Sequence, residues 1–194
     1  MSISVSIMLP FLKELNGEAS ELLQVCCNCH RRAAADNNNL SGAVAQEAML
    51  GSGSFAQAAC AAILSTGNRH APIRAARHVL REGTPGAIRE GVRNGLLIAG
   101  FGNSFFKDSI DPAFQPLADQ LAADFPDIWD TILSVQEAIR DSGKDLHPNA
   151  AILTAAVCEI IDMPDGIEEA LFILPRLPVW ADKISRQQRG ELWA

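Results

Sequence analysis

The spacing of apolar residues constrains the fold of this chain more than any other feature of its sequence. Apolar side chains recur every three or four positions, as on one face of an α-helix, and the alternation typical of β-strands is nearly absent. Ile128, Ile132, Val135 and Ile139 show this repeat clearly. Proline and glycine stand where the runs break, as expected at joints between helices. The sequence therefore predicts an all-α fold.

These joints divide the pattern into many short helices. A first helical face runs from Ile7 to Cys26, and an Ala-rich stretch begins after the turn Asp36–Asn39 and continues to about Thr66. Gly51–Ser54 is expected to divide that stretch in two. Six further helices are predicted. The first holds Pro72 in its first turn, the second begins at Pro85 and ends near 96–99, and the third ends at Ala123. The last three span 124–142, Pro148 to Ile161, and 167–174.

The composition indicates a globular domain that does not bind nucleic acid. At 194 residues, the chain is long enough for one domain, or for one domain with a small companion. Its 48% of hydrophobic residues can fill a core, and its 20% of charged residues exclude general disorder. The net charge is −7, and no stretch concentrates lysine and arginine, which argues against a nucleic-acid partner.

Further features predict a cytoplasmic protein that does not enter a membrane. No apolar run reaches the length of about 18 residues that a membrane span needs. The apolar segment Ile3–Leu12 lacks the positive region and the cleavage site of a signal peptide. The five cysteines, an odd number, suit a reducing cytosol better than a disulfide framework.

One motif carries most of the functional information. The run G-F-G-N-S-F-F-K-D-S-I-D-P at Gly100–Pro112 places two glycines around an aromatic residue, with a lysine and an Asp-Pro pair at fixed offsets. It resembles the segment G-F-G-H-R-V-Y-K-x-x-D-P-R of citrate synthases and citryl-CoA lyases. Four other segments resemble parts of this family in the same order. Residues 44–64 resemble its Ala-rich helix pair, and residues 67–72 resemble its G-P-x-H-G-G loop. Residues 146–151 resemble its Y-P-N-V-D motif and, more loosely, residues 174–180 resemble its I-A-R-x-x-G-W motif.

The resemblance implies the multi-helical, all-α fold of the citrate synthase family. It suits the compact citryl-CoA lyase form, which lacks much of the N-terminal part of the large domain. We expect a large-domain remnant, formed by 1–67 with 164–194, to carry the dimer helices, and 68–163 to form a small, CoA-side domain. The Ala- and Gly-rich stretch Ala43–Leu64 is expected to form the interface of a homodimer, as the matching helices do in the family.

The family's chemistry needs a base and hydrogen-bond donors, and this chain keeps only some of them. In the family a carboxylate takes a proton from acetyl-CoA, one histidine stabilises the enol and a second polarises the keto acid. The resemblance places His70 at the first histidine and Asn103 at the second. Ala151 replaces the catalytic aspartate, and Ala113 replaces a carboxylate-binding arginine. The predicted catalytic residues are thus His70 and Asn103, with altered or lost carbon–carbon bond chemistry.

The resemblance also assigns binding residues. Arg176 matches an arginine that grips a substrate carboxylate, and Asn37 falls at a substrate-binding histidine. The residues assigned to CoA are Lys107, at its nucleotide end, with Gly100, Gly102 and Asn149. A tight turn between packed helices is the alternative explanation of the two glycines. The expected ligands are an acyl-CoA, as a thioester substrate, and a small carboxylic acid, with no covalently bound cofactor.

A cysteine cluster raises the hypothesis of a metal site. Cys26-Cys27-Asn28-Cys29-His30 contains four candidate ligands. Consecutive helical residues point about 100° apart, and no second ligand pair follows downstream, so a tetrahedral site is poorly supported. We expect no metal and interpret the cluster as a buried helix face or an interface.

Two classes of function remain open. An enzyme would be an acyl-CoA-dependent acyltransferase of citrate synthase type, or of citryl-CoA lyase type. The alternative is a non-catalytic, dimeric structural or interaction protein, that is, a pseudoenzyme. An open cleft lined by His70, Asn103 and Arg176 would favour the first class.

Overall fold

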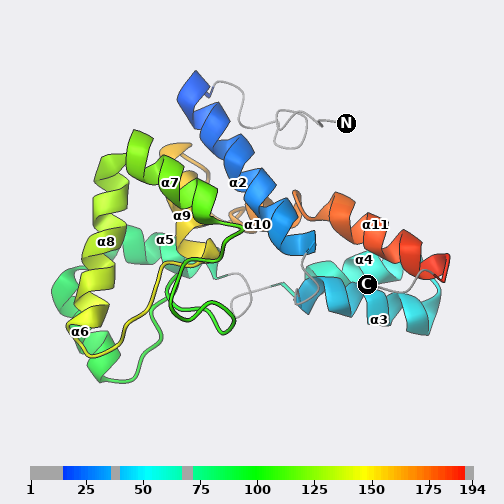
Figure 1. Cartoon of the computed structure of the whole chain (residues 1–194), viewed down its shortest axis with the longest axis horizontal. Helices are drawn as coiled ribbons and strands as arrows, with labels where there is room; N and C mark the ends of the chain where they lie inside the picture. Colours follow the sequence, from blue (N-terminus) through cyan, green and yellow to red (C-terminus); the bar gives the residue numbers. More distant parts are fainter. Residues whose placement is uncertain (1–14, 36–39, 67–71, 191–194) are drawn as a thin grey trace.

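The protein is all-α, as predicted. The computed structural model describes residues 15–35, 40–66 and 72–190, and within them it shows helices and no strand (Figure 1). The helices are α2 (Gly17–Ala35), α3 (Leu40–Ser52), α4 (Phe55–Leu64), α5 (Ile73–Glu82), α6 (Pro85–Arg93), α7 (Gln115–Asp124), α8 (Pro126–Arg140), α9 (Ala150–Ile160), α10 (Glu169–Ile173) and α11 (Leu177–Gln188). None of them is long and apolar enough to cross a bilayer.

Local capping signals set where several helices begin. The Ser54 hydroxyl accepts a hydrogen bond from the backbone N–H of Gln57 and caps α4, so the predicted break in the Ala-rich stretch is confirmed. Thr84 caps α6 in the same way, with Pro85 as the first helical residue. These short-range contacts explain why the sequence pattern located both helices.

The clearest differences from the sequence prediction concern α6, α9 and α11. Helix α6 ends at Arg93, because Gly95 takes a positive φ of 80° and turns the chain before the apolar run at 96–99. Helix α9 begins after Asn149, whose extended backbone makes it the cap, so Pro148 lies outside the helix. Helix α11 was not predicted, although a proline occupies its first turn, where proline is tolerated.

The buried side chains form two clusters of unequal size. The larger cluster contains residues of α2 and of α5 to α10. The smaller cluster is formed by α3, α4 and α11 and contains Ala45, Met49, Ala58, Ala62, Trp180 and Ile184. Ile173 packs against both clusters. In Figure 1 these three helices lie together as an arm beside the larger group. The division into 1–67 with 164–194, and 68–163, stays a prediction.

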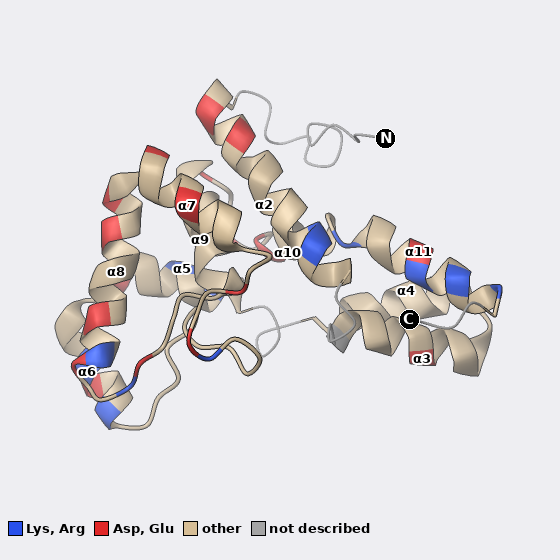
Figure 2. Cartoon of the chain, viewed as in Figure 1, with Lys and Arg blue, Asp and Glu red and all other residues tan. Residues whose placement is uncertain are grey.

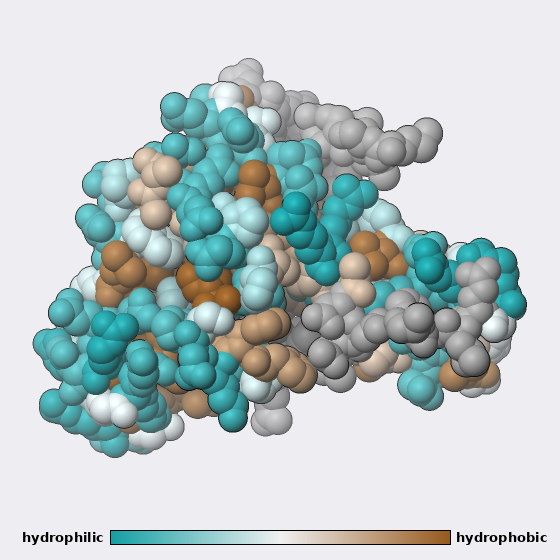
Figure 3. Space-filling model, in the orientation of Figure 1, coloured by the Kyte–Doolittle hydropathy of each residue, from teal (hydrophilic) through white to brown (hydrophobic). Residues whose placement is uncertain are grey.

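Helices α3 and α4 present an apolar surface with almost no charge. Glu47 is the only charged residue between Leu40 and Leu64, as the tan colour of these helices in Figure 2 shows. Leu50, Phe55 and Leu64 are 62%, 45% and 82% exposed. Elsewhere, on the face shown in Figure 3, hydrophobic residues lie in small patches among hydrophilic ones.

Candidate functional site

Arg176 lies in the turn between α10 and α11 and is the most unusual charged residue described. Only 3% of it is exposed. The central carbon of its guanidinium lies 3.7 Å from the centroid of the Phe172 ring, and Nη2 donates to Nδ1 of His30 at 3.3 Å. Nε and Nη1 are buried and have no hydrogen-bond partner among the described residues. The guanidinium is thus bound to His30 and stacked on Phe172, and two of its nitrogens make no hydrogen bond to a described residue.

His30, on α2, connects Arg176 to α9. Its Nε2 lies 2.8 Å from Oγ1 of Thr154, and the edge-on rings of Phe114 and Phe172 lie 4.9 and 5.3 Å away between centroids. The side chain is fully buried. This burial, together with the charge of Arg176, lowers the pKa of His30 well below its ordinary value. His30 is therefore neutral at physiological pH.

Arg176 keeps its charge in the same environment. Burial lowers the pKa of Arg176 to about 9, and the carboxylate of Asp111 opposes that shift. The guanidinium is thus still protonated at neutral pH. A buried cation without a bound counter-ion is costly, because the water it has lost is not replaced. A ligand carboxylate that accepts hydrogen bonds from Nη1 or Nε would remove this cost.

The glycine motif is joined to the start of α9 by backbone hydrogen bonds. Gly102 N–H donates to the His147 carbonyl, and Asn149 N–H donates to the Gly100 carbonyl, both at 2.8 Å. The Asn149 side chain donates to the Gly102 carbonyl at 2.8 Å and accepts from Ala151 N–H at 2.9 Å. The amide of Asn149 therefore fastens the motif to the helix.

Gly100 packs directly on α9. A Cβ at this position would lie 2.5 Å from Cβ of Ile152, and the backbone φ is +93°. Both observations require glycine here, whether or not a ligand approaches this segment. The alternative in which the motif makes a tight turn between packed elements thus has direct structural support.

The remaining described candidates have local contacts or are exposed. Oδ1 of Asn103 accepts from the backbone N–H of Phe105 at 2.9 Å and of Phe106 at 3.4 Å, so its carbonyl stabilises a turn. Lys107 is exposed. Ala151 is buried in the first turn of α9 and brings no carboxylate.

Two of the predicted residues cannot be placed. His70 and Asn37 lie outside the described residues. His30, in contrast, was not predicted as a site residue. It lies four positions after Cys26 and so continues the buried face of α2, which is the one signal that the sequence offers.

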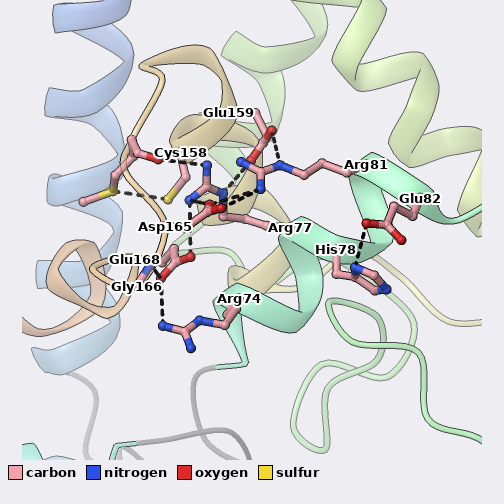
Figure 4. A network of polar contacts seen from close by, with 11 residues as sticks. Arg74, Arg77, His78, Arg81, Glu82, Cys158, Glu159, Asp165, Gly166 and Glu168 are labelled. Carbon is pink, nitrogen blue, oxygen red and sulfur yellow. Dashed lines mark hydrogen bonds and ion pairs between the residues drawn. The ribbon is translucent and has the colours of Figure 1, made fainter.

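The basic residues of α5 form a structural network (Figure 4). Arg77 is buried, donates to the Glu159 carboxylate and contacts Glu168 at 3.3 Å. Arg81 bonds Glu159 at 2.9 Å and Asp165 at 3.0 Å. These residues line an open hollow of about 500 Å³ whose arginines and carboxylates are equal in number: Arg74, Arg77, Arg81, Glu82, Asp165 and Glu168. The balanced charges tie α5 to α9 and α10 and leave no free cation for a ligand.

The cysteine cluster lies in the larger core. Cys26, Cys27 and Cys29 are buried and free. Burial raises the pKa of the Cys27 thiol to about 11 and raises the pKa of the Cys26 thiol well above its ordinary value. Within the described part of the chain, no three side chains of metal-ligating type come together as a site. The buried helix face proposed from the sequence agrees with this position.

Comparisons by sequence and by structure give different results. No family model matches the chain, and no curated protein matches it by sequence. The structure resembles that of citryl-CoA lyase from Hydrogenobacter thermophilus, with a TM-score of 0.82 and 20% identity. This match covers 98% of the chain and 78% of the lyase.

Two larger enzymes share the same fold. ATP citrate lyase from Methanothrix soehngenii, in complex with citrate and coenzyme A, has a TM-score of 0.75 and 21% identity, over 96% of this chain and 34% of that one. Citrate synthase from Thermoplasma acidophilum, in a ternary complex with carboxymethyl coenzyme A and oxaloacetate, has a TM-score of 0.74 and 20% identity, over 95% and 53%. The chain therefore has the all-α fold of citrate synthase and citryl-CoA lyase, as its motifs indicated.

Proposed function

We propose that this protein binds a small carboxylic acid at Arg176 and a CoA thioester beside the glycine motif. The observation that carries the proposal is the buried guanidinium of Arg176, whose Nε and Nη1 have no hydrogen-bond partner in the part of the chain that the structure describes. Among the described arginines, Arg77 is just as buried but is surrounded by carboxylates. Only Arg176 combines burial with free donors, the combination that an anion-binding residue needs.

The CoA part of the proposal is supported by the related folds. The ATP citrate lyase was solved with coenzyme A, and the citrate synthase with a carboxymethyl derivative of it. In this chain the exposed Lys107 is available for a phosphate of the nucleotide, and Asn103 is the described candidate for a contact with the thioester. All five cysteines are free, which suits the cytoplasm, where CoA thioesters are used.

We propose that carbon–carbon bond chemistry of the citrate synthase type is lost or altered. Ala151 has no group that takes a proton from a thioester methyl. The side-chain carbonyl of Asn103 already accepts a hydrogen bond within a local turn. Removing an acid or base costs typically about 10²–10⁴-fold in rate. We expect no citrate synthase turnover with acetyl-CoA and oxaloacetate. Thiol release at ordinary enzymatic rates would contradict this and point to another base.

The binding site is tested by titrating the purified protein with citrate in a calorimeter. Arg176→Met should weaken binding by about 10- to 150-fold, the range for a lost hydrogen bond to a charged group. Arg89→Met, at an exposed arginine on α6, is the matched control and should bind as the wild type does. Equal affinity of the Arg176 variant and the wild type would contradict the proposal.

The second candidate is a dimeric protein without catalytic activity, and the α3–α4 surface favours the dimer in either case. Its exposed Leu50, Phe55 and Leu64 lie on helices with a single charge. Burying such a surface against a second copy is favourable, because apolar area leaves water at little electrostatic cost. In sedimentation equilibrium, Phe55→Glu should dissociate the dimer, and Leu133→Glu, at a similarly exposed residue on α8, should not. A monomeric wild type at micromolar concentration would exclude this interface.

A further inference from the structure

We infer that His30 is the positioning residue of the Arg176 site: it holds one nitrogen of the guanidinium and thereby aims the others at the ligand. The inference rests on the proposed binding of a carboxylate at Arg176. None of the motifs of the resemblance includes His30, since it lies in α2, before the first matched segment. Its role follows from the contacts alone.

The direction of each hydrogen bond can be derived. A guanidinium nitrogen only donates, so Nδ1 of His30 must accept from Nη2 of Arg176 and carries no proton. The neutral ring then carries its proton on Nε2, which donates to Oγ1 of Thr154. The Thr154 hydroxyl in turn donates to the carbonyl of Ala150 at 2.7 Å. The chain runs in a single direction, from Arg176 through His30 to the first turn of α9.

The aromatic neighbours fix the ring that this chain depends on. The rings of Phe114 and Phe172 pack against His30 in T-shaped arrangements, and the Phe172 ring also lies against the guanidinium. One aromatic side chain therefore sets the positions of both His30 and Arg176. An arginine ordered before the ligand arrives loses little rotamer freedom on binding, which raises the affinity.

His30 must stay neutral for this role. Among the described residues, the charged group that acts on the pKa of His30 is Arg176, and it disfavours a second positive charge, as burial does. Asp111, ahead of α7, acts on Arg176 and on Cys29 of α2. With these groups around it, the ring is expected to stay neutral and to keep one tautomer at physiological pH, because burial and the charge of Arg176 lower its pKa.

The ring itself can be observed without any ligand. Long-range ¹⁵N–¹H spectra of the wild-type protein should show His30 protonated at Nε2, unprotonated at Nδ1 and unchanged as the pH falls from 8 to 6.5, the ordinary pKa of histidine. A proton on Nδ1, or a titration of His30 in this interval, would overturn the inference. This measurement does not depend on the proposed function.

Citrate binding then separates positioning from simple packing. His30→Phe keeps a ring but removes the acceptor, and should weaken citrate binding about tenfold. His30→Asn places an amide oxygen near the former Nδ1 and should recover most of that loss. Thr154→Val removes the anchor of His30, together with the hydrogen bond to the Ala150 carbonyl, and serves if the Phe variant does not fold. His78→Phe, at an exposed histidine of α5, is the control.

The outcomes distinguish the positioning role of His30 from the proposed binding of a carboxylate at Arg176. If the wild type binds citrate and Arg176→Met does not, while His30→Phe binds as tightly as the wild type, His30 has no positioning role. The same conclusion follows if the Phe and Asn variants are equally weak, because the ring would then act only through packing. If the wild type does not bind citrate at all, the proposed function fails, and the spectra still decide the state of His30.

Discussion

Replacing Gly100 by alanine should destabilise the protein through two separable effects. The first is backbone strain: a φ of +93° lies where L-residues with a side chain are disfavoured, by about 1–2 kcal/mol. The second is a clash, because the new Cβ would lie 2.5 Å from Cβ and 3.2 Å from Cα of Ile152. Overpacking of this kind typically costs about 1–3 kcal/mol. We therefore expect a loss of about 2–5 kcal/mol in the free energy of unfolding.

Gly95 provides a control that contains the strain without the clash. Its φ is +80°, and a Cβ there would have no atom within 4 Å. Gly95→Ala should lose only about 1–2 kcal/mol. Urea unfolding followed by circular dichroism measures both variants under the same conditions. Equal losses would refute the clash with α9, and with it the claim that packing requires glycine at position 100.

A second variant tests which atoms clash. The nearest atom to the added methyl group is Cβ of Ile152, which alanine also possesses. Adding Ile152→Ala to Gly100→Ala should therefore give no rescue. A double variant more stable than Gly100→Ala would show that the side-chain branches of Ile152, and not the surface of the helix, limit the approach.

Three further outcomes can be measured independently. Arg77→Met should lower the free energy of unfolding by about 3–5 kcal/mol, because the buried carboxylate of Glu168 loses a cationic partner. The loss should be smaller when Glu168→Gln is added. Burial raises the pKa of Glu168, but hydrogen bonds from its own backbone and from Gly166, with the charges of Arg74 and Arg77, lower it further than burial raises it. A carboxyl group whose pKa is lower in the folded state stabilises the fold above its unfolded pKa, and this contribution is lost as pH falls through the folded pKa. The difference in the free energy of unfolding between Arg77→Met and the wild type should therefore narrow below about pH 4. A difference that stays constant with pH would contradict this. Cys60 is the one exposed cysteine, so iodoacetamide should modify it first in the folded protein, and comparable labelling of Cys27 or Cys158 would disprove the packing of those thiols.

The sequence located features that depend on neighbouring residues. The break at Gly51–Ser54 was predictable, because glycine and a serine cap act within a few positions. The helical class followed from a repeat of three to four residues. Arg176 was found through its resemblance to a family motif, and the structure adds that two of its nitrogens have no hydrogen-bond partner among the described residues.

The features that the sequence missed depend on distant contacts. His30 bonds residues 124 and 146 positions away, at Thr154 and Arg176, and no local pattern encodes such pairs. Asn149 was assigned to CoA, and the structure shows its amide bonded to Gly102, 47 positions away. Helix α11 escaped prediction because Pro178 lies in its first turn, and a proline indicates a helix break unless the start of a helix is already known.

The unequal cores have a consequence for local unfolding. The smaller one consists of six buried side chains, and three of them are alanines, so the arm formed by α3, α4 and α11 can open at a lower free energy than α9 in the larger core. A second copy seated on α3 and α4 would add its own burial to this opening cost. Amide hydrogen exchange in the arm should then slow as protein concentration rises, while exchange in α9 stays the same. The proposed dimer would thus supply burial that the smaller core of a single copy lacks.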